Sequence, residues 1–170
     1  MRSKMKNIQN IGLIVAFILL GNYGMIAQEN PPIPVEVEVN TAQFLNFGAF
    51  TVGDAGGTVS VDHNGTRTWT GDVTLLNSGS TVSPALYDVY ANPGTILTIT
   101  HPATFELTGT SGQKINLEIN SYSTGNTFIS TQNPDIPNSV YIGGTLILGS
   151  SAANGPGSYS GTIHITFNQQ

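Results

Sequence analysis

Serines and histidines are the residues with which this chain could build a hydrolytic site. Such a site needs a nucleophile, a general base and an acid that orients the base. The Gly-x-Ser-x-Gly elbow is missing, because GSYSG at residues 157–161 has a tyrosine at its centre and fits a strand. His164 falls on the polar face of that strand, His63 falls in a turn, and His101 precedes a proline at a strand end. We therefore expect structural histidines, no catalytic residue and no enzymatic activity.

Aspartates could hold a metal ion if they were clustered. Asp54, Asp62 and Asp72 are instead eight and ten residues apart and belong to no EF-hand or Asp-rich loop. Cysteine is absent, which excludes disulfides, thiolate catalysis and cysteine-based zinc sites. Calcium held at one end of the domain through loop carbonyls is the alternative. We favour solvated aspartates in turns and expect no metal ion and no cofactor.

Two glutamates in the N-terminal part could form a glycosidase pair. Glu36 and Glu38 lie on one face of a predicted strand, where residues two apart are separated by about 7 Å. That spacing is near the one required for glycoside hydrolysis. A charged outer face also prevents unwanted pairing at an edge strand, and we favour that interpretation.

Aromatic residues suggest another function, a platform on which a sugar ring could stack. The available side chains are Trp69, Tyr87, Tyr90, Tyr122 and Tyr141. Strand alternation places several of them inward, so we expect them to pack in the core.

An export signal precedes the elements that must position these residues. Three basic residues, Arg2, Lys4 and Lys6, come before an apolar run, and small or polar residues follow it. This pattern predicts a secretory signal peptide over residues 1–27. The run, residues 11–20, is about half as long as a membrane span requires, so no membrane insertion is expected after signal removal. We expect an exported protein that is periplasmic, on the cell surface or extracellular.

The rest of the chain is acidic and has the size of one domain. Residues 28–34, QENPPIP, contain three prolines and are predicted to form an extended linker, and residues 35–170 a single domain. Without the signal only Arg67 and Lys114 are basic, against ten acidic residues, so the formal charge is −8. Nucleic acids and anionic membrane surfaces are therefore excluded as partners.

Strand patterns recur about every ten residues in this domain. The predicted strands are PVEVEVN (34–40), LNFGAF (45–50), TVSVD (58–62), TRTWTGDVTLL (66–76), ALYDVYA (85–91), TILTITH (95–101), TFELTG (104–109), KINLEINSY (114–122), VYIGGTLILG (140–149) and the terminal stretch 159–168. Turns are predicted at GDAGG and at the hairpin pair Asn64-Gly65, and one long irregular loop is predicted over residues 123–138. Helical periodicity is absent. The pattern predicts an all-β, antiparallel β-sandwich of about nine to ten strands.

Several of these stretches resemble a known family. Its members usually carry LxFG, TVxV-x-x-x-GTRT, pAxFxV, VGGTLxVG and a final GxYxGxxxVTV. The chain has LNFG, TVSVDHNGTRT, PALYDVYA, IGGTLILG and GSYSGTIHITF in the same order, with Ile142 in place of the usual valine and with His164 and Phe167 in the last motif. Over residues 35–168 it therefore resembles the secreted bacterial family catalogued as domain of unknown function 4402.

The resemblance carries expectations about fold and function. The family is similar in sequence to the major subunit of the Mat/Ecp common pilus, which implies an immunoglobulin-like sandwich displayed in or beyond the cell envelope. It supplies no catalytic residues. We expect a secreted structural or adhesive envelope protein, in the finer form a fimbrial-type subunit whose partners are copies of itself or other envelope proteins. The alternative is a monomeric module that binds a carbohydrate or a host ligand.

The N-terminal strand is where contact between copies is expected. Val35, Val37 and Val39 alternate with polar residues after the linker, as in a strand that adds to an exposed sheet edge and fills alternate pockets. They are candidate donor-strand plugs. Pairing of this strand within its own domain is the alternative, and we favour it. If the terminal strand is interior to a sheet, the N-terminal strand is its expected neighbour.

Overall fold

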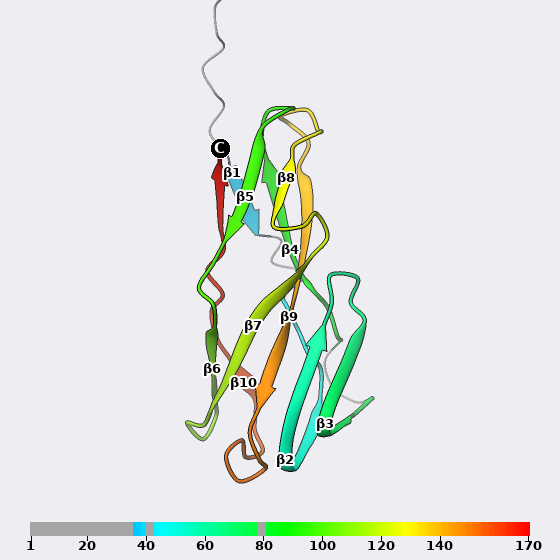
Figure 1. Ribbon diagram of the computed structural model, residues 1–170, viewed down its shortest axis with the longest axis vertical. Coiled ribbons are helices and arrows are strands. Elements are labelled where there is room, and N and C mark those ends of the chain that lie inside the picture. The colour runs from blue at the N-terminus through cyan, green and yellow to red at the C-terminus, as the bar shows by residue number, and fades with distance from the viewer. Residues whose placement is uncertain (1–35, 40–42, 78–80) are drawn as a thin grey trace, which may run out of the picture. The chain divides into compact units, whose positions relative to one another are not determined.

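The computed structural model describes residues 36–39, 43–77 and 81–170, all within one compact unit, Ile33–Gln170. Figure 1 shows them as coloured ribbon. The predicted signal peptide, the linker and Val35 lie outside this part of the chain. In the described residues no helix has the length and apolar character needed to cross a membrane.

The described residues form strands and turns, with no helix among them, which confirms the all-β prediction. The strands are β1 (Glu36–Val39), β2 (Phe50–Val61), β3 (Arg67–Leu75), β4 (Ala85–Tyr90), β5 (Ile96–Thr100), β6 (Phe105–Gly109), β7 (Lys114–Tyr122), β8 (Thr127–Ile129), β9 (Asn138–Leu148), β10 (Tyr159–Ser160) and β11 (Thr166–Gln169). Eleven strands result, and two of them, β8 and β10, have only three and two residues.

Two antiparallel sheets make up the fold. The larger has eight strands in the order β1-β4-β9-β7-β6-β10, and β2 also pairs with β9 and carries β3 on its other side. The smaller has the order β11-β5-β8. The long orange strand β9 in Figure 1 is the centre of the larger sheet, because β4, β2 and β7 all pair with it. This arrangement confirms an antiparallel β-sandwich.

The core follows from strand alternation, because every second side chain points to the same face of a sheet. In β4 the inward residues include Tyr87 and Val89, and in β11 the inward residue is Phe167. The rings of Tyr87 and Phe167 lie 5.8 Å apart between centroids, so this pair joins the larger sheet to the smaller one. Burial of such apolar surface is the main stabilising contribution to a fold of this kind.

The first hairpin differs from its prediction. LNFGAF is not a strand before Phe50 and makes a single bridge, Asn46 to Ser83. GDAGG is not a turn but a bulged part of β2, with a register shift between Val52 and Gly57. The strands approach closely there, since a Cβ on Gly57 would lie 2.1 Å from the carbonyl oxygen of Thr70. Glycine, which usually indicates a turn, here permits that approach.

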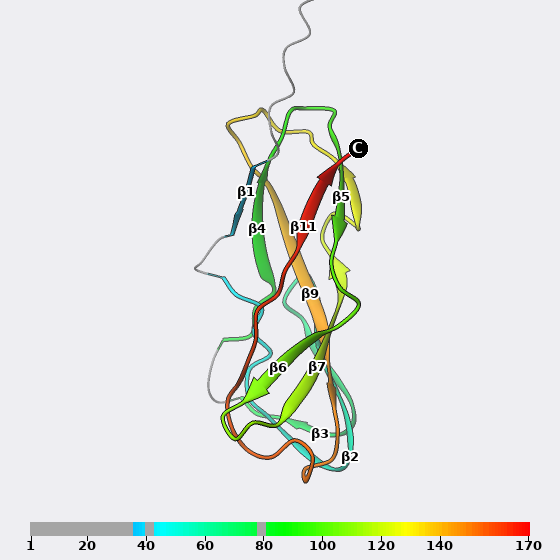
Figure 2. The same ribbon diagram turned by 90° about the vertical axis from the view of Figure 1, so that its left-hand side faces the viewer.

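The terminal stretch is two strands rather than one. β10 pairs with β6 in the larger sheet and β11 pairs with β5 in the smaller one, so residues 161–165 cross between them. Figure 2 shows this red segment running up to β11 beside β5. Strands that switch sheets at a bend are a common way to close a sandwich. β11 is thus an edge strand whose neighbour is β5, so the condition under which the N-terminal strand was its expected neighbour, an interior position, is not met.

The predicted irregular loop, residues 123–138, contains β8, which pairs with the start of β5. Phe128 is half-buried and packs against the core, which gives this three-residue strand an apolar anchor. The proline-rich part of the loop forms a turn, closed by a bond of 2.9 Å from the Ile136 N–H to the Asn133 carbonyl.

Candidate functional site

Two sequence motifs, LNFG and GTRT, meet in the structure. The guanidinium of Arg67 donates to the carbonyls of Phe47 and Ala49 at 3.0 and 3.2 Å, and to that of Leu76 at 3.0 Å. Gly48 has a φ of 69°, and a Cβ there would lie 2.6 Å from the Arg67 Nη1 atom. The arginine therefore holds the irregular segment before β2 against the end of β3. Its side chain thus stabilises the fold.

The GGTL motif also serves close approach between strands. A Cβ on Gly143 would lie 2.2 Å from the Val61 carbonyl oxygen, and one on Gly144 would lie 2.6 Å from that of Glu118. These two carbonyls belong to β2 and β7, on opposite sides of β9. The register of β7 against β9 shifts at this point, between Ile119 and Ser121. The two glycines let three strands converge around a bulge.

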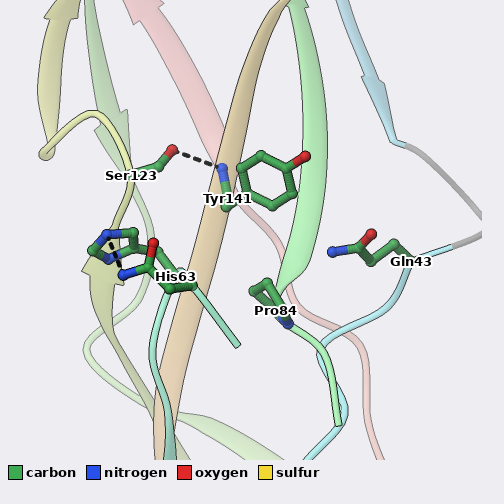
Figure 3. A pocket seen from close by; sticks show the side chains of 6 residues that line it. Gln43, His63, Pro84, Ser123 and Tyr141 are labelled. Atoms are coloured by element: carbon green, nitrogen blue, oxygen red, sulfur yellow. Dashed lines mark hydrogen bonds between the residues drawn. The ribbon is translucent and has the colours of Figure 1, made fainter. Parts of the chain in front are cut away.

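A shallow pocket of 270 Å³ opens close to that bulge and is the candidate site. Its lining residues are Gln43, His63, Asn64, Pro84, Ser123 and Tyr141. Figure 3 shows the Tyr141 ring between Ser123 and His63 on one side and Pro84 and Gln43 on the other. Among the residues that the structure describes, the lining carries aromatic, prolyl, amide, hydroxyl and imidazole groups and no carboxylate, ammonium or guanidinium.

Main-chain contacts hold the pocket walls in place. The Ser123 hydroxyl accepts the Tyr141 N–H at 2.9 Å, and the Ser123 N–H donates to the Tyr141 carbonyl at 2.9 Å. In the turn that carries His63, the carboxylate of Asp62 accepts the N–H groups of Asn64 and Thr66 at 2.9 and 2.8 Å. These Asx-type bonds of Asp62 stabilise the turn between β2 and β3, at the position where the Asn64-Gly65 pair predicts a hairpin turn.

Ser121 and His63 form a pair beside the pocket that invites a catalytic interpretation. The Ser121 Oγ lies 2.9 Å from His63 Nδ1. The same oxygen accepts the His63 main-chain N–H at 2.9 Å, and His63 Nε2 faces the Asn64 amide nitrogen at 3.2 Å. A triad needs a carboxylate at that second nitrogen. The pair therefore ties the β2–β3 turn to β7 and has no orienting acid among the described residues.

The other two histidines lie apart from the pocket. His101 contacts the Pro102 carbonyl through Nδ1 and the Tyr122 hydroxyl through Nε2. His164 is exposed on the segment that crosses between the sheets. Within the described ranges no group of three His, Cys, Asp or Glu residues could hold a metal ion.

The three aspartates weighed as metal ligands have local roles. Asp62 closes the hairpin turn, and Asp54 accepts a hydrogen bond of 2.8 Å from the Ser151 hydroxyl. Asp72 packs so closely against Gly53 that a Cβ there would lie 1.9 Å from its Oδ2 atom. The structure does not bring them together into a cluster, as far as its described residues go.

The N-terminal strand carries the predicted plugs Val37 and Val39. β1 pairs antiparallel with β4 of the same chain, with Glu36 opposite Tyr90 and Val39 opposite Tyr87 in the register. The side chains of β1, including the two glutamates considered as a carboxylate pair, lie outside what the structure describes. The roles of Val35, Val37 and Val39 as plugs stay predictions.

The aromatic residues divide between core and surface. Tyr87 is buried, Tyr90, Tyr122 and Tyr141 are half-buried, and Trp69 on the edge strand β3 is 53% exposed. Of the five, Tyr141 lines the pocket. The sequence interpretation did not predict that the lining comes together, because its residues belong to five separate segments that no local pattern connects.

Titration of the buried tyrosines gives a testable pH dependence. Burial raises the pKa of Tyr87 and of Tyr122 above 10.0, so folding favours the neutral phenol. Their stabilising contribution is present below the unfolded pKa and is lost as pH rises through the raised folded pKa. We expect the free energy of unfolding to fall above about pH 10, and to fall less steeply in Tyr87→Phe. Urea unfolding of both proteins across this range measures the slopes, and equal slopes would contradict the assignment to Tyr87.

Comparison with known proteins gives one match. The model of the family described as Domain of unknown function (DUF4402) matches residues 37–168. No curated protein and no solved structure matches the chain.

Proposed function

The chain belongs to the DUF4402 family, and we propose that it is an exported structural or adhesive protein of the cell envelope that acts without catalysis. Two observations support this proposal. The groups with catalytic potential near the pocket are engaged in holding the fold, as in the Ser121–His63 pair. The family motifs are also used for strand contacts, as in Arg67 and Gly143.

The finer proposal is a fimbrial-type subunit, similar to the pilus subunit that the sequence resemblance implies. The position of β1 is the observation that carries it. β1 has four residues, lies at the end of the larger sheet and follows the proline-rich linker. β4 is paired with β9 on its other side, so its outer edge would be free without β1. We propose that β1 of one copy can occupy this edge in the next copy, with Val35, Val37 and Val39 as plugs.

Deletion of residues 28–40 tests this strand exchange. The shortened protein is expected to have a lower melting temperature, and added PVEVEVN peptide is expected to restore it. A matched peptide with the changes V37D and V39D should not, because charged side chains cannot fill apolar pockets. The full-length protein is expected to form polymers that resist mild denaturant.

A monomeric full-length protein at high concentration, with the amides of residues 36–39 protected from hydrogen exchange, would contradict the subunit proposal. This measurement uses the unchanged protein, so it tests the subunit proposal even if the shortened protein fails to fold. A monomeric module that binds a carbohydrate or a host ligand is the second candidate function. The pocket around Tyr141 is the observation that favours it.

A further inference from the structure

The pocket beside Tyr141 has a lining that suits an uncharged, hydroxyl-rich ligand. The six described lining residues include no Asp, Glu, Lys or Arg. A charged ligand would therefore lose hydration there without an ion pair to an Asp, Glu, Lys or Arg side chain of this lining. The ligand that fits is a neutral polar molecule.

Several polar groups of the lining have no internal hydrogen-bond partner in the described part of the chain. They are the side-chain amide of Gln43, the side-chain oxygen of Asn64 and the hydroxyl of Tyr141. An amide offers both donors and acceptors, and so does a phenol. A sugar hydroxyl donates and accepts as well, which makes it the natural counterpart. In Figure 3 the amide end of Gln43 points toward Tyr141 and Pro84.

Two rings supply the apolar part of the lining. The half-buried Tyr141 ring gives the main surface against which the C–H face of a sugar can pack, and the buried Pro84 ring contributes only a small part of the lining. At 270 Å³ the pocket is smaller than the roughly 300–1,000 Å³ of sites for drug-sized ligands. It therefore accommodates a single ring rather than an extended chain.

The pocket is held in shape before any ligand arrives. Ser123 fixes the main chain at Tyr141 through two bonds of 2.9 Å, and Ser121 fixes His63. A site with ordered walls loses little conformational entropy on binding. Since the pocket is open and the ligand small, we expect a dissociation constant in about the millimolar range.

We propose that this pocket binds one residue of a neutral saccharide, with Tyr141 and Pro84 packing on the ring and Gln43 and Asn64 bonding to its hydroxyls. The site goes beyond the envelope role proposed above. It does not invoke strand exchange, because the residues argued to contact the ligand, such as Gln43, Asn64 and Tyr141, lie outside β1. A chain that never polymerises would still bind.

The test is a titration of the purified, isotope-labelled chain with glucose, galactose, mannose and N-acetylglucosamine, followed by NMR. At least one of them should produce saturable shifts at the amides of Asn64, Ser123 and Tyr141. Glucuronic acid and glucosamine, which carry a charge, should bind at least tenfold more weakly. Glycerol serves as the polyol control and should give no saturable shift.

Variants locate the binding. Tyr141→Ala should weaken binding at least tenfold. Gln43→Ala should weaken it about threefold, which corresponds to the loss of one hydrogen bond. Tyr141→Phe keeps the ring and removes only the hydroxyl, so it still tests the proposal if the alanine variant does not fold. Its affinity is expected to be about threefold lower. Trp69→Ala and Gln132→Ala, whose side chains are exposed outside the pocket, should bind as the unchanged protein does.

Three outcomes would overturn the proposal. They are the absence of saturable shifts with all four neutral sugars, shifts that cluster around Trp69 instead of Tyr141, and equal affinity for neutral and charged sugars. Polymer formation in the strand-exchange experiment bears on none of them. Failure of one proposal is therefore distinguishable from failure of the other.

Discussion

Gly143→Ala is expected to lower the free energy of unfolding by about 4 kcal/mol or more, enough to unfold a domain of ordinary stability. The added Cβ would lie 2.2 Å from the Val61 carbonyl oxygen and 2.7 Å from the carbonyl carbon of Asp62. Both are main-chain atoms, so no side-chain rotation relieves the overlap. β2 would have to move away from β9, and the pairing between them would be lost.

Gly94→Ala is the matched control for Gly143→Ala. Gly94 has a φ of 85°, which strains an alanine, but a Cβ there would meet no atom within 4 Å. Its expected cost is therefore the conformational term alone, about 1–2 kcal/mol. Urea unfolding of the two variants compares the free-energy cost of steric overlap at Gly143 with the cost of backbone strain at Gly94. If Gly143→Ala proves no less stable than Gly94→Ala, the close approach at the β9 bulge is not a constraint on the fold.

Arg67→Met is expected to cost about 3 kcal/mol of folding free energy. Methionine keeps part of the apolar stem but removes the donors to the carbonyls of Phe47, Ala49 and Leu76. Arg67→Lys should be intermediate, because an ammonium group cannot reproduce the planar fork that reaches several acceptors at once. The melting temperature and urea midpoint of both variants measure the loss.

Lys114→Met is the control for the removal of a positive charge. Lys114 forms an ion pair with Glu106 at 2.6 Å, and both side chains are about half exposed, at 60% and 49%. Exposed pairs of this kind contribute about 0–1 kcal/mol. An equal loss of folding free energy in Arg67→Met and Lys114→Met would mean that stability depends on net charge and not on the hydrogen bonds of the arginine.

Strand alternation was sufficient to predict the core where strands are long. In TVSVD the valines Val59 and Val61 are buried and Ser60 between them is only half-buried, as the pattern indicates. The terminal stretch likewise has its apolar residues inward, although it divides between two sheets. Alternation predicts which face a side chain occupies, but it contains no information about which sheet the strand joins.

Glycine was the main source of error. In GDAGG the glycines permit close strand contact rather than a turn, and sequence composition cannot distinguish the two uses. The candidate site was missed for a different reason. Its lining unites Gln43, Pro84, Tyr141 and the turns after β2 and β7, and only the completed fold brings those segments together.

The central position of β9 has a consequence for how the chain folds over time. β9 pairs with β2, and in that pairing Gly57 meets Leu148, more than half the chain away. Loop closure over such a distance must precede any gain from the contact, which places folding in the millisecond-to-second range typical of non-local sheets. Until residues 138–148 have been synthesised, the β2–β3 hairpin presents an unpaired edge to other chains. The length of that interval, rather than the stability of the finished sheets, then determines how much of the newly made protein is lost to aggregation.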